Sequence, residues 1–507
     1  MSYLAKQIAG VLALDSVEPA VHFKDRAVTW RDVRRTAEGL RKKLDDLGLP
    51  AAAGVGVMLR NRPQNYSAIL GVIIGERCVI TLNPIMPDNK VAADIRKLKP
   101  SVVVASPDDW ARQDIVAATR EIGAVGLVLG DNLDFEIKVH PELSKLGPGP
   151  FADLLPDIAV LMLTSGTTGE PKRAPLTYRQ LELNFKRSAR ADPTRSEDDP
   201  PQIRPGSAIL FSPFVHISGM YFALTAAVDG RAMHLMERFS VEEWRKVVAE
   251  VKPKTAGGPP TVLKMILDAN IPKAELASIV NFTCGTAPIS PDVVDQFVER
   301  YGTPVLSTYG ATEFAGAICG WSLTTFNKYW KEKRGSAGRM HPGLEARTVD
   351  RETFEVLPAG EVGILELRGG VIGDGENWVR VSDLAKVDAE HFLWITGRAD
   401  NAIIRGGFKV LPDHVVRAIE QHPAIKEASV VGLPDERLGA VPVAAYVVKP
   451  GAKDPGAEGL STFLREQLTA YQVPVQFRRV DDLPRTPSMK VSMPAVKALF
   501  EAEASGG

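Results

Sequence analysis

Cysteine is scarce in this sequence, with only three among 507 residues. Cys78, Cys284 and Cys319 form no C-x-x-C pair and lie in no cluster of histidines and cysteines. A disulfide framework and a structural zinc site both require such groupings, so the sequence argues against both. Isolated cysteines are typical of a reducing compartment, and we expect a cytoplasmic protein.

Long hydrophobic runs are missing too. A membrane-spanning helix needs roughly 20 apolar residues, whereas the longest candidate, Ala68–Gly75, is shorter and is better explained as a buried helix. The N-terminal segment is interrupted by Lys6 and Gln7, which makes it a poor signal peptide. We therefore expect no integral membrane segment, while peripheral membrane contact stays open for a lipid substrate.

An excess of one charge is also absent. The chain has 61 Lys and Arg against 62 Asp and Glu, and its formal net charge is −1. Nucleic acids and anionic membrane surfaces attract proteins through a surplus of positive charge. We therefore expect no nucleic-acid partner.

The sequence does have enough length and apolar content for more than one core, since 507 residues exceed an ordinary single domain and 45% of them are hydrophobic. Short β-rich runs alternate with helical patterns, which is the rhythm of a layered α/β fold. We predict strands at Val55–Leu59, Ser101–Ala105 and Val125–Leu129, helices at Gln64–Gly75 and Asp109–Glu121, a second round over Ala208–Gly302, and a surface loop at Arg195–Gly206.

The pattern changes after Gly335. Glu345–Arg368 predicts β-hairpins with Gly/Pro turns, and a small unit of mixed helices and strands follows Arg398. We predict an α/β protein whose large N-terminal domain, residues 1–399, combines layered α/β subdomains with a β-barrel-like part. A small α+β C-terminal domain covers residues 400–507. Its expected elements are helices at Pro412–His422 and Gly459–Leu468 and strands at Ala428–Val431 and Val443–Val448.

The strongest motif is Thr164-Ser-Gly-Thr-Thr-Gly-Glu-Pro-Lys172, which follows an apolar strand at Ile158–Leu163. Its two glycines allow unusual backbone angles, its hydroxyls and backbone N–H groups can donate to phosphate oxygens, and Lys172 can follow a developing pyrophosphate. The spacing differs from G-x-x-x-x-G-K-[ST]. A flexible surface turn is the alternative, but the preceding strand and the following Pro-Lys favour a phosphate loop.

This loop resembles the phosphate loop of the adenylate-forming superfamily, which includes acyl-CoA synthetases, peptide-synthetase adenylation domains and luciferases. The chain is most similar to a standalone acyl- or aryl-CoA ligase. A single motif of such a family could occur by chance. Chance is a poor explanation for five further motifs that follow in the family's order. The resemblance extends over nearly the whole chain. The five further motifs are Tyr309-Gly-Ala-Thr-Glu313, Lys333-Arg-Gly-Ser-Ala-Gly338, Ser382-Asp383, Thr396-Gly-Arg-Ala-Asp400 and Leu483-Pro-Arg-Thr-Pro-Ser-Met-Lys490.

The resemblance implies that the chain binds ATP and Mg²⁺. Tyr309 would stack on adenine, Gly310 would let the backbone come close, and Thr312 would donate to the α-phosphate. Glu313 and Thr168 would hold Mg²⁺, a cation that prefers oxygen ligands. The implied nucleotide site comprises Thr164, Ser165, Gly166, Thr167, Thr168, Gly169, Lys172, Gly285, Thr286, Ala287, Pro288, Tyr309, Gly310, Ala311, Thr312, Asp383, Ile395, Arg398 and Lys490.

Lys490 is the residue that the resemblance assigns to the first half-reaction. A carboxylate that attacks the α-phosphate brings two anions together, and a lysine between them supplies position and charge. The implied catalytic set is Lys490 with Glu313, Thr168 and Lys172. The family usually has glycine before this lysine, whereas Met489 stands here, so we expect a stiffer loop.

The second half-reaction implies a mobile C-terminal domain. Rotation about a hinge at Asp400 would remove Lys490 and bring in a loop whose Gly406, Gly407 and Phe408 line a coenzyme A tunnel. Coenzyme A is the expected acceptor because the chain has no carrier domain. A separate carrier protein, a luciferase-like use of the adenylate, and a non-catalytic nucleotide- or acyl-binding relative remain alternatives.

The acyl site is implied by Pro213–Gly219, which resembles the family's P-x-x-H-x-x-G segment and places His216 at its border. By resemblance, Phe314–Gly320 borders the acyl pocket, and its small, uncharged residues would leave room for a large apolar acid with a medium or long chain, an aryl group or a polycyclic ring. An amino acid is disfavoured because Val215 or His216 stands where an Asp is usual. We expect a monomer or homodimer. The implied pocket comprises Phe214, His216, Tyr221, Thr286, Ala315 and Gly316.

Overall fold

The structure, a computed structural model, describes residues 1–130, 136–164, 172–191, 196, 198–399, 402–405, 408–435, 437–486 and 489–504. The chain divides into two compact units. Unit 1 is Met1–Ser165, Pro171–Thr286 and Asp292–Ile318, and unit 2 is Gly166–Glu170, Ala287–Pro291 and Cys319–Gly507.

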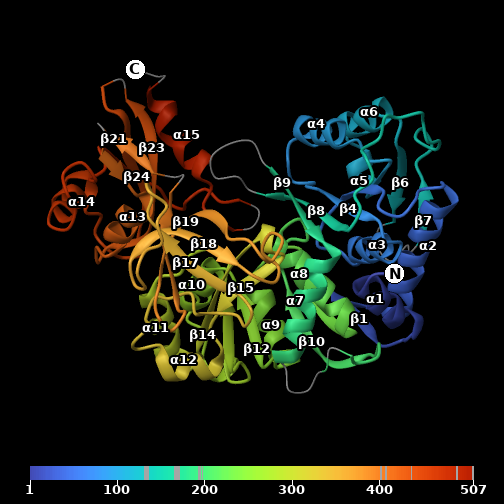
Figure 1. The fold of residues 1–507 in the computed structure, drawn as a ribbon, viewed down its shortest axis with the longest axis horizontal. Helices are drawn as coiled ribbons and strands as arrows, with labels where there is room; N and C mark the ends of the chain where they lie inside the picture. Colours follow the sequence, from blue (N-terminus) through green and yellow to red (C-terminus); the bar gives the residue numbers. More distant parts are fainter. Residues whose placement is uncertain are drawn as a thin grey trace. The chain divides into compact units, whose positions relative to one another are not determined.

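A seven-stranded sheet in the order β7-β6-β5-β3-β4-β8-β9 frames the first part of unit 1 (Figure 1). Its five inner strands are parallel, and the edge strands β7 and β9 are antiparallel to their neighbours. The strands are β3 (Gly54–Met58), β4 (Cys78–Leu82), β5 (Val102–Ala105), β6 (Val125–Leu129), β7 (Ile137–Val139), β8 (Ile158–Thr164) and β9 (Lys172–Thr177).

Helices cover both faces of this sheet, as an almost wholly buried parallel sheet requires. Alternate strand residues point into two different cores, because successive side chains face opposite sides of the sheet. Val55 and Val57 belong to one core, and Met58 and Val103 belong to the other. The first core holds α1 (Tyr3–Ala13), α2 (Trp30–Asp46) and α3 (Pro63–Ile74), and the second holds α4 (Asp88–Leu98), α5 (Pro107–Trp110) and α6 (Gln113–Glu121).

The helix predicted over Asp109–Glu121 is wrong in one respect, because it is broken into α5 and α6. Arg112 between them is extended, with φ −83° and ψ 105°. Its guanidinium pairs with Asp88 at 2.7 Å and donates to the carbonyl oxygens of Pro84 and Met86. These three partners hold Arg112 outside a helix.

Two further sheets complete unit 1. One has the order β10-β11-β1-β2, and the other contains the parallel neighbours β12, β13 and β14. The surface loop predicted over Arg195–Gly206 is wrong at its end, because β10 begins at Arg204 and pairs with Arg231. The elements are β1 (Pro19–Phe23), β2 (Arg26–Thr29), α7 (Tyr178–Ala191), β10 (Arg204–Leu210), α8 (Ile217–Asp229), β11 (Arg231–Leu235), α9 (Val241–Val251), β12 (Thr255–Gly258), α10 (Pro260–Asp268), η1 (Lys273–Leu276), β13 (Asn281–Cys284), α11 (Pro291–Tyr301), β14 (Val305–Ala311), η2 (Thr312–Phe314) and β15 (Gly316–Gly320).

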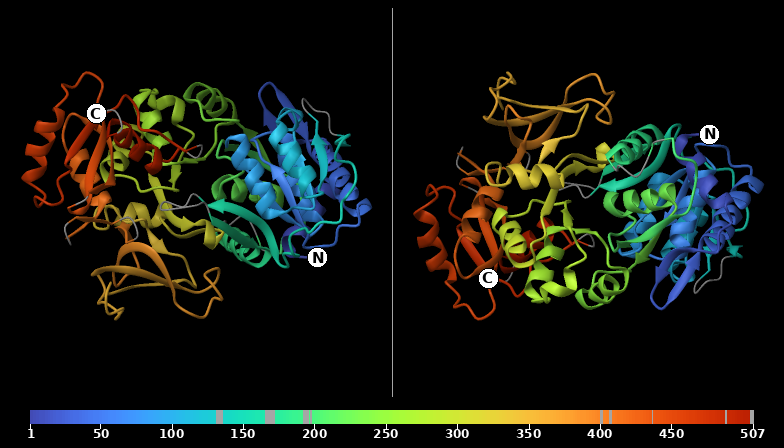
Figure 2. Two further views of the ribbon diagram at one scale, coloured as in Figure 1. Left: turned by 90° about the horizontal axis from the view of Figure 1, so that it is seen from above. Right: turned by 90° about the horizontal axis from the view of Figure 1, so that it is seen from below.

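Unit 2 contains an antiparallel sheet in the order β17-β18-β19-β20, drawn in gold to orange in both views of Figure 2. This sheet lies in the region for which a β-barrel-like part is predicted, and β17 and β20 are its edges. Trp378, in the segment that precedes β19, stacks against the guanidinium groups of Arg347 and Arg368, which lie 4.1 and 4.6 Å from its ring. The elements are α12 (Leu323–Tyr329), β16 (Arg339–Met340), β17 (Glu345–Val349), β18 (Val362–Arg368), β19 (Val379–Val387) and β20 (Leu393–Arg398).

The C-terminal part of unit 2 is built on the long antiparallel pair β23–β24. This part contains both helices and strands, as the predicted α+β class requires. Helices α13 and α14 share one core with the β23–β24 pair, and α15 shares another that contains Val443 and Phe500. The elements are β21 (Ile403–Arg405), β22 (Phe408–Val410), α13 (Pro412–Glu420), β23 (Ile425–Asp435), β24 (Gly439–Val448), α14 (Gly456–Arg465), β25 (Gln476–Arg479) and α15 (Met493–Ala504).

The predicted α/β class, with a large N-terminal and a small C-terminal domain, is confirmed. The proposed boundary at Asp400 lies outside the described residues, so it stays a prediction. Across the described ranges, no helix combines the length and the apolar character that a membrane span demands.

Candidate active site

The ends of the predicted phosphate loop are held together by the hairpin β8–β9. Thr164 pairs with Lys172 in antiparallel register, directly on either side of the loop. The residues from Ser165 to Pro171, Thr168 among them, lie outside the described part of the chain, as do the side chains of Thr164 and Lys172. The loop is therefore anchored on the last inner strand and the edge strand of the seven-stranded sheet.

The carboxyl ends of two parallel strands bring further predicted residues together. Strands β13 and β14 are neighbours, with Cys284 opposite Ser307, so Gly285 and Thr286 leave the sheet at the edge where Tyr309 continues β14. Ligands of open α/β sheets bind at such carboxyl ends. Thr286 is exposed and has φ 71°, a left-handed conformation that is strained for a β-branched residue.

Glu313 lies on η2, a short turn that contacts β9, the strand leaving the phosphate loop. Its carboxylate is exposed, and no described residue forms an ion pair with it. The fold itself requires glycine at position 310. A Cβ at Gly310 would lie 2.2 Å from the carbonyl oxygen of Gly316, which is too close for any other residue. The structure thus places Glu313 beside the hairpin that carries the loop.

Helix α7 fixes this turn through polar side chains on one face. It begins at a reciprocal cap, in which Gln180 N donates to Thr177 Oγ1 at 3.0 Å and Thr177 N donates to Gln180 Oε1 at 3.1 Å. Gln180 Nε2 donates to the carbonyl oxygen of Glu313 at 3.2 Å. One turn later, buried Asn184 donates to the carbonyl oxygens of Phe314 and Ala315.

The segment with His216 is held by a buried asparagine. Asn61 is 5% exposed, accepts a bond from Phe214 N at 3.0 Å and donates to the carbonyl oxygens of Phe211 and Ser212. His216 is the N-terminal flanking residue of α8, and its side chain makes no capping bond. Phe214 is fully buried and Tyr221 packs against the same core.

In unit 2, the pairing of β19 with β20 brings Asp383 opposite Arg398. Arg398 Nη1 lies 3.6 Å from Asp383 Oδ1, and its Nη2 donates to Ser382 Oγ. Ile395 lies on the same strand as Arg398, opposite Ala385. Three predicted nucleotide-binding residues therefore form one group on this sheet.

Lys490 lies in unit 2, in a turn where Thr486 N donates to its carbonyl oxygen at 2.7 Å. Burial lowers the pKa of its ammonium group. Met489 before it is left-handed, with φ 64°, a backbone conformation that glycine adopts without strain. Asp400, Gly406 and Gly407 lie outside the described residues, as does the side chain of Phe408.

Comparisons with known proteins identify the family of this chain. Residues 14–375 match the family of AMP-binding enzymes, and residues 417–490 match the AMP-binding enzyme C-terminal domain. The chain belongs to the AMP-binding enzyme family. The two matches leave residues 376–416 between them, the interval in which the proposed domain boundary falls.

Individual relatives of this AMP-binding enzyme cover almost its whole length. It is 27% identical to the long-chain-fatty-acid–CoA ligase of Bacillus subtilis, over 93% of this chain and 90% of that one. It is 29% identical to the sulfoacetate–CoA ligase of Cupriavidus necator, over 92% and 91% of the two chains. The ATP-bound crystal structure of MatB from Rhodopseudomonas palustris superposes with a TM-score of 0.81 at 22% identity, covering 99% of both chains, and thus shares the fold.

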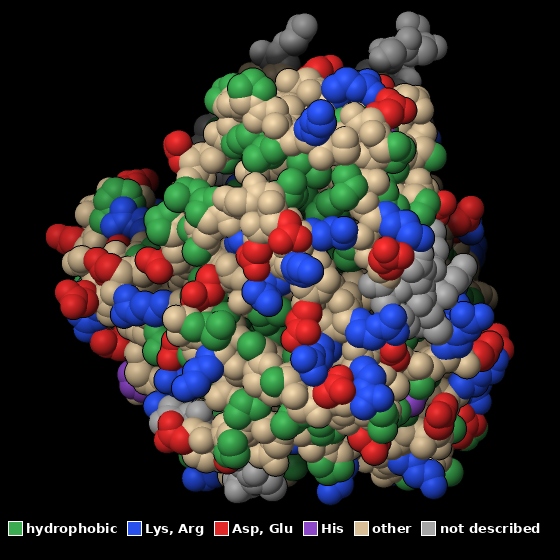
Figure 3. Space-filling view, turned by 90° about the vertical axis from the view of Figure 1, so that its right-hand side faces the viewer, with side chains coloured by type: hydrophobic (Ala, Val, Ile, Leu, Met, Phe, Trp, Pro, Cys, Tyr) green, Lys and Arg blue, Asp and Glu red, His purple; other side chains and the backbone are tan. Residues whose placement is uncertain are grey.

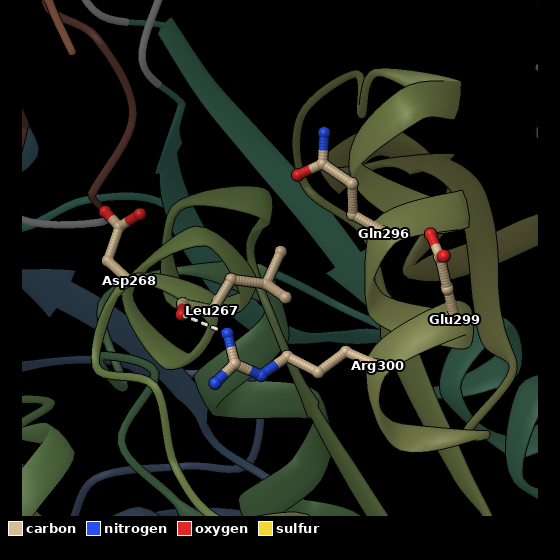
Figure 4. Close-up of a pocket in the computed structure, with 5 residues that line it drawn as sticks. All are labelled: Leu267, Asp268, Gln296, Glu299 and Arg300. Atoms are coloured by element: carbon tan, nitrogen blue, oxygen red, sulfur yellow. Dashed lines mark hydrogen bonds between the residues drawn. The ribbon is translucent and has the colours of Figure 1, made fainter. Parts of the chain in front are cut away.

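Other features of this AMP-binding enzyme lie apart from the predicted site. A cavity of about 470 Å³ between α10 and α11 is lined by Leu267, Asp268, Gln296, Glu299 and Arg300, none of which is a predicted site residue (Figure 4). Positive and negative side chains are intermixed on the face shown in Figure 3. The three cysteines are free and buried.

Sequence reasoning missed the polar residues that position the site. Gln180, Asn184 and Arg187 recur at helical spacing on α7, and this periodicity was the available signal. Asn61 offered no comparable signal, because its partners lie about 150 residues away in the chain.

Proposed function

We propose that this enzyme is an AMP-forming acid–thiol ligase that joins a carboxylic acid to coenzyme A at the expense of ATP. The observation that carries this proposal is the contact of the Glu313 turn with β9, the strand that leaves the phosphate loop. In the same unit, Gly285 and Thr286 follow the carboxyl end of β13, and Tyr309 lies on the neighbouring strand β14. A phosphate loop, an exposed carboxylate and an aromatic ring are the parts that an ATP site needs.

In the first half-reaction, a carboxylate oxygen of the acid attacks the α-phosphorus and pyrophosphate leaves. The phosphate loop and Lys172 hold the departing phosphates, and Thr312 donates to the α-phosphate. Glu313 with Thr168 would hold Mg²⁺, which supplies charge neutralisation between the phosphates. Lys490 bridges the two reacting anions, and Asp383 and Arg398 hold the ribose.

In the second half-reaction, the thiol sulfur of coenzyme A attacks the acyl carbon, the bond to AMP breaks, and the thiol proton passes to solvent. We propose that residues 400–507 rotate about Asp400 between the two steps, replacing Lys490 with the loop of Gly406, Gly407 and Phe408. Such a hinge motion is of a known kind.

The acid is proposed to have a large apolar body. Phe214 is fully buried, Tyr221 packs against the same core, and Ala315 and Gly316 are small residues. The names of the relatives do not select an acid, since they include a long-chain fatty acid and sulfoacetate. We also propose a cytoplasmic enzyme with small-molecule partners.

An acid panel tests the proposal. The purified protein is incubated with ATP and Mg²⁺, with and without coenzyme A, and the products are identified by mass spectrometry. We expect acid-dependent pyrophosphate release in both cases, and acyl-CoA with AMP when coenzyme A is present. Absence of both products with every acid would contradict the ligase, and a clear preference for acetate or propionate would contradict the large apolar acid.

A further inference from the structure

Arg187 on α7 is a sheltered cation for which the described residues supply no carboxylate partner. Burial lowers the pKa of its guanidinium group, although an arginine stays protonated in proteins. Four other sheltered arginines of this chain each pair with an acid at 2.6–2.8 Å. These pairs are Arg60–Asp109, Arg77–Asp45, Arg173–Asp94 and Arg485–Glu427.

The bonds of Arg187 all go to neutral oxygens. Its Nη2 donates to the carbonyl oxygen of Ala317 at 2.6 Å and to Asn184 Oδ1. Its Nη1 and Nε make no hydrogen bond to a described residue. The remaining N–H groups of this partly desolvated guanidinium can therefore donate to a charged acceptor.

The surroundings of Arg187 are residues assigned to the acyl site. A Cβ on Gly316 would lie 3.7 Å from both the Asn184 side chain and Tyr221 Cε2, so these groups meet at one point. Tyr221 stacks on Phe185 of α7, with ring centroids 5.2 Å apart. The cation therefore lies at the border of the predicted apolar walls.

We propose that Arg187 determines substrate specificity by binding a second anionic group of the acid, remote from the carboxylate that is activated. The substrate class is then an acid with an apolar body that ends in a carboxylate or a sulfonate. Charge-assisted hydrogen bonds from a guanidinium suit such a group. This inference rests on the proposed ligase function.

The test compares diacids with monoacids of equal chain length, from succinate against butanoate to decanedioate against decanoate. An aryl pair, 3-(4-carboxyphenyl)propanoate against 3-phenylpropanoate, is included. We expect wild-type kcat/KM for acyl-CoA formation to be at least about tenfold higher for one or more diacids, the discrimination that a charge-assisted bond gives. Arg187→Met should abolish that preference, measured as the ratio of kcat/KM for each diacid to kcat/KM for its matched monoacid.

Arg187→Lys and Arg179→Met are the controls. Lysine keeps the charge and should retain part of the preference, whereas exposed Arg179 on the same helix should have no influence on it. A wild-type enzyme that prefers monoacids throughout, or an Arg187→Met variant that loses both classes equally, would overturn the inference and leave the ligase function standing. If Arg187→Met does not fold, as judged by its thermal unfolding, the wild-type preference and Arg187→Lys decide. Absence of product with every acid would overturn both proposals.

Discussion

The side-chain amide of Asn184 donates a hydrogen bond to the carbonyl oxygen of Phe314 at 3.2 Å, across 130 residues of sequence. A second bond reaches Ala315 at 3.3 Å, and Asn184 is 1% exposed. The helix that follows the phosphate loop is thereby tied to the turn that carries Glu313. Asn184 thus joins Gln180, which donates to the carbonyl oxygen of Glu313, in holding this turn against α7.

Asn184→Ala should therefore weaken both stability and ATP binding. Two buried carbonyl groups lose their donor, which costs about 1–3 kcal/mol of unfolding free energy. Displacement of Glu313 should raise the KM for MgATP more than it changes the KM for the acid. Urea unfolding and initial rates of pyrophosphate release measure the two effects.

Asn89→Ala is the matched control, because Asn89 is exposed on helix α4. It should leave both quantities within error. An Asn184→Ala enzyme with an unchanged KM for MgATP would refute the positioning role and leave only a structural one.

Thr286→Gly should make the protein more stable. The left-handed backbone at Thr286, with φ 71°, is unfavourable for a residue with a Cβ by roughly 1–2 kcal/mol. Glycine removes this strain, but it loses more conformational entropy on folding, which offsets part of the gain. We expect a net gain of up to about 1 kcal/mol in urea unfolding. The same change at Thr283, within strand β13, should destabilise the protein. A loss of stability at both positions would show that Thr286 is not strained.

Lys490→Ala should separate the two half-reactions. Without the ammonium group, the carboxylate and the α-phosphate repel each other, so adenylate formation should fall by at least about a hundredfold. Thioester formation from pre-made acyl-adenylate should persist, because the lysine takes no part in it. Rapid-quench measurements of both steps provide the test, and unimpaired adenylation would disprove the assignment of the lysine.

The pH dependence of adenylation should also report Lys490. Burial lowers its pKa from the ordinary value of 10.5, so the charged form is lost at a lower pH than for an exposed lysine. Because the protonated form is the active one, the rate of the first half-reaction should decline on the alkaline side. Lys490→Arg should remove this decline, since arginine keeps its charge. A decline that persists unchanged in Lys490→Arg would point to another group.

Local patterns in the sequence predicted the framework of this fold. The buried strands at 55–59 and 125–129 were visible because both faces of a parallel strand are apolar. Pairs that depend on sheet register, such as Asp383 with Arg398, were identified as motifs, but their contact follows from the pairing of β19 with β20. The break at Arg112 could not be predicted, because Asp88 and two distant carbonyl groups cause it.

The same limit applies to the candidate site. The sequence identified Glu313 through its motif and assigned Gly310 to a close approach of the backbone, yet it could not show that the backbone of Gly316 requires the small size of Gly310. Asn184 and Arg187 escaped notice because polar residues on a helix are usually exposed. Their importance arises from carbonyl groups that only the tertiary fold brings to them.

The measurement that tests the central claim most directly follows the oxygen atoms of the acid. An acid with both carboxylate oxygens labelled with ¹⁸O is converted with ATP and coenzyme A, and the nucleotide product is analysed by mass spectrometry. If the carboxylate attacks the α-phosphorus and the thiol then displaces AMP, one labelled oxygen must appear in AMP and none in pyrophosphate. Label in inorganic phosphate together with ADP would contradict an adenylate intermediate.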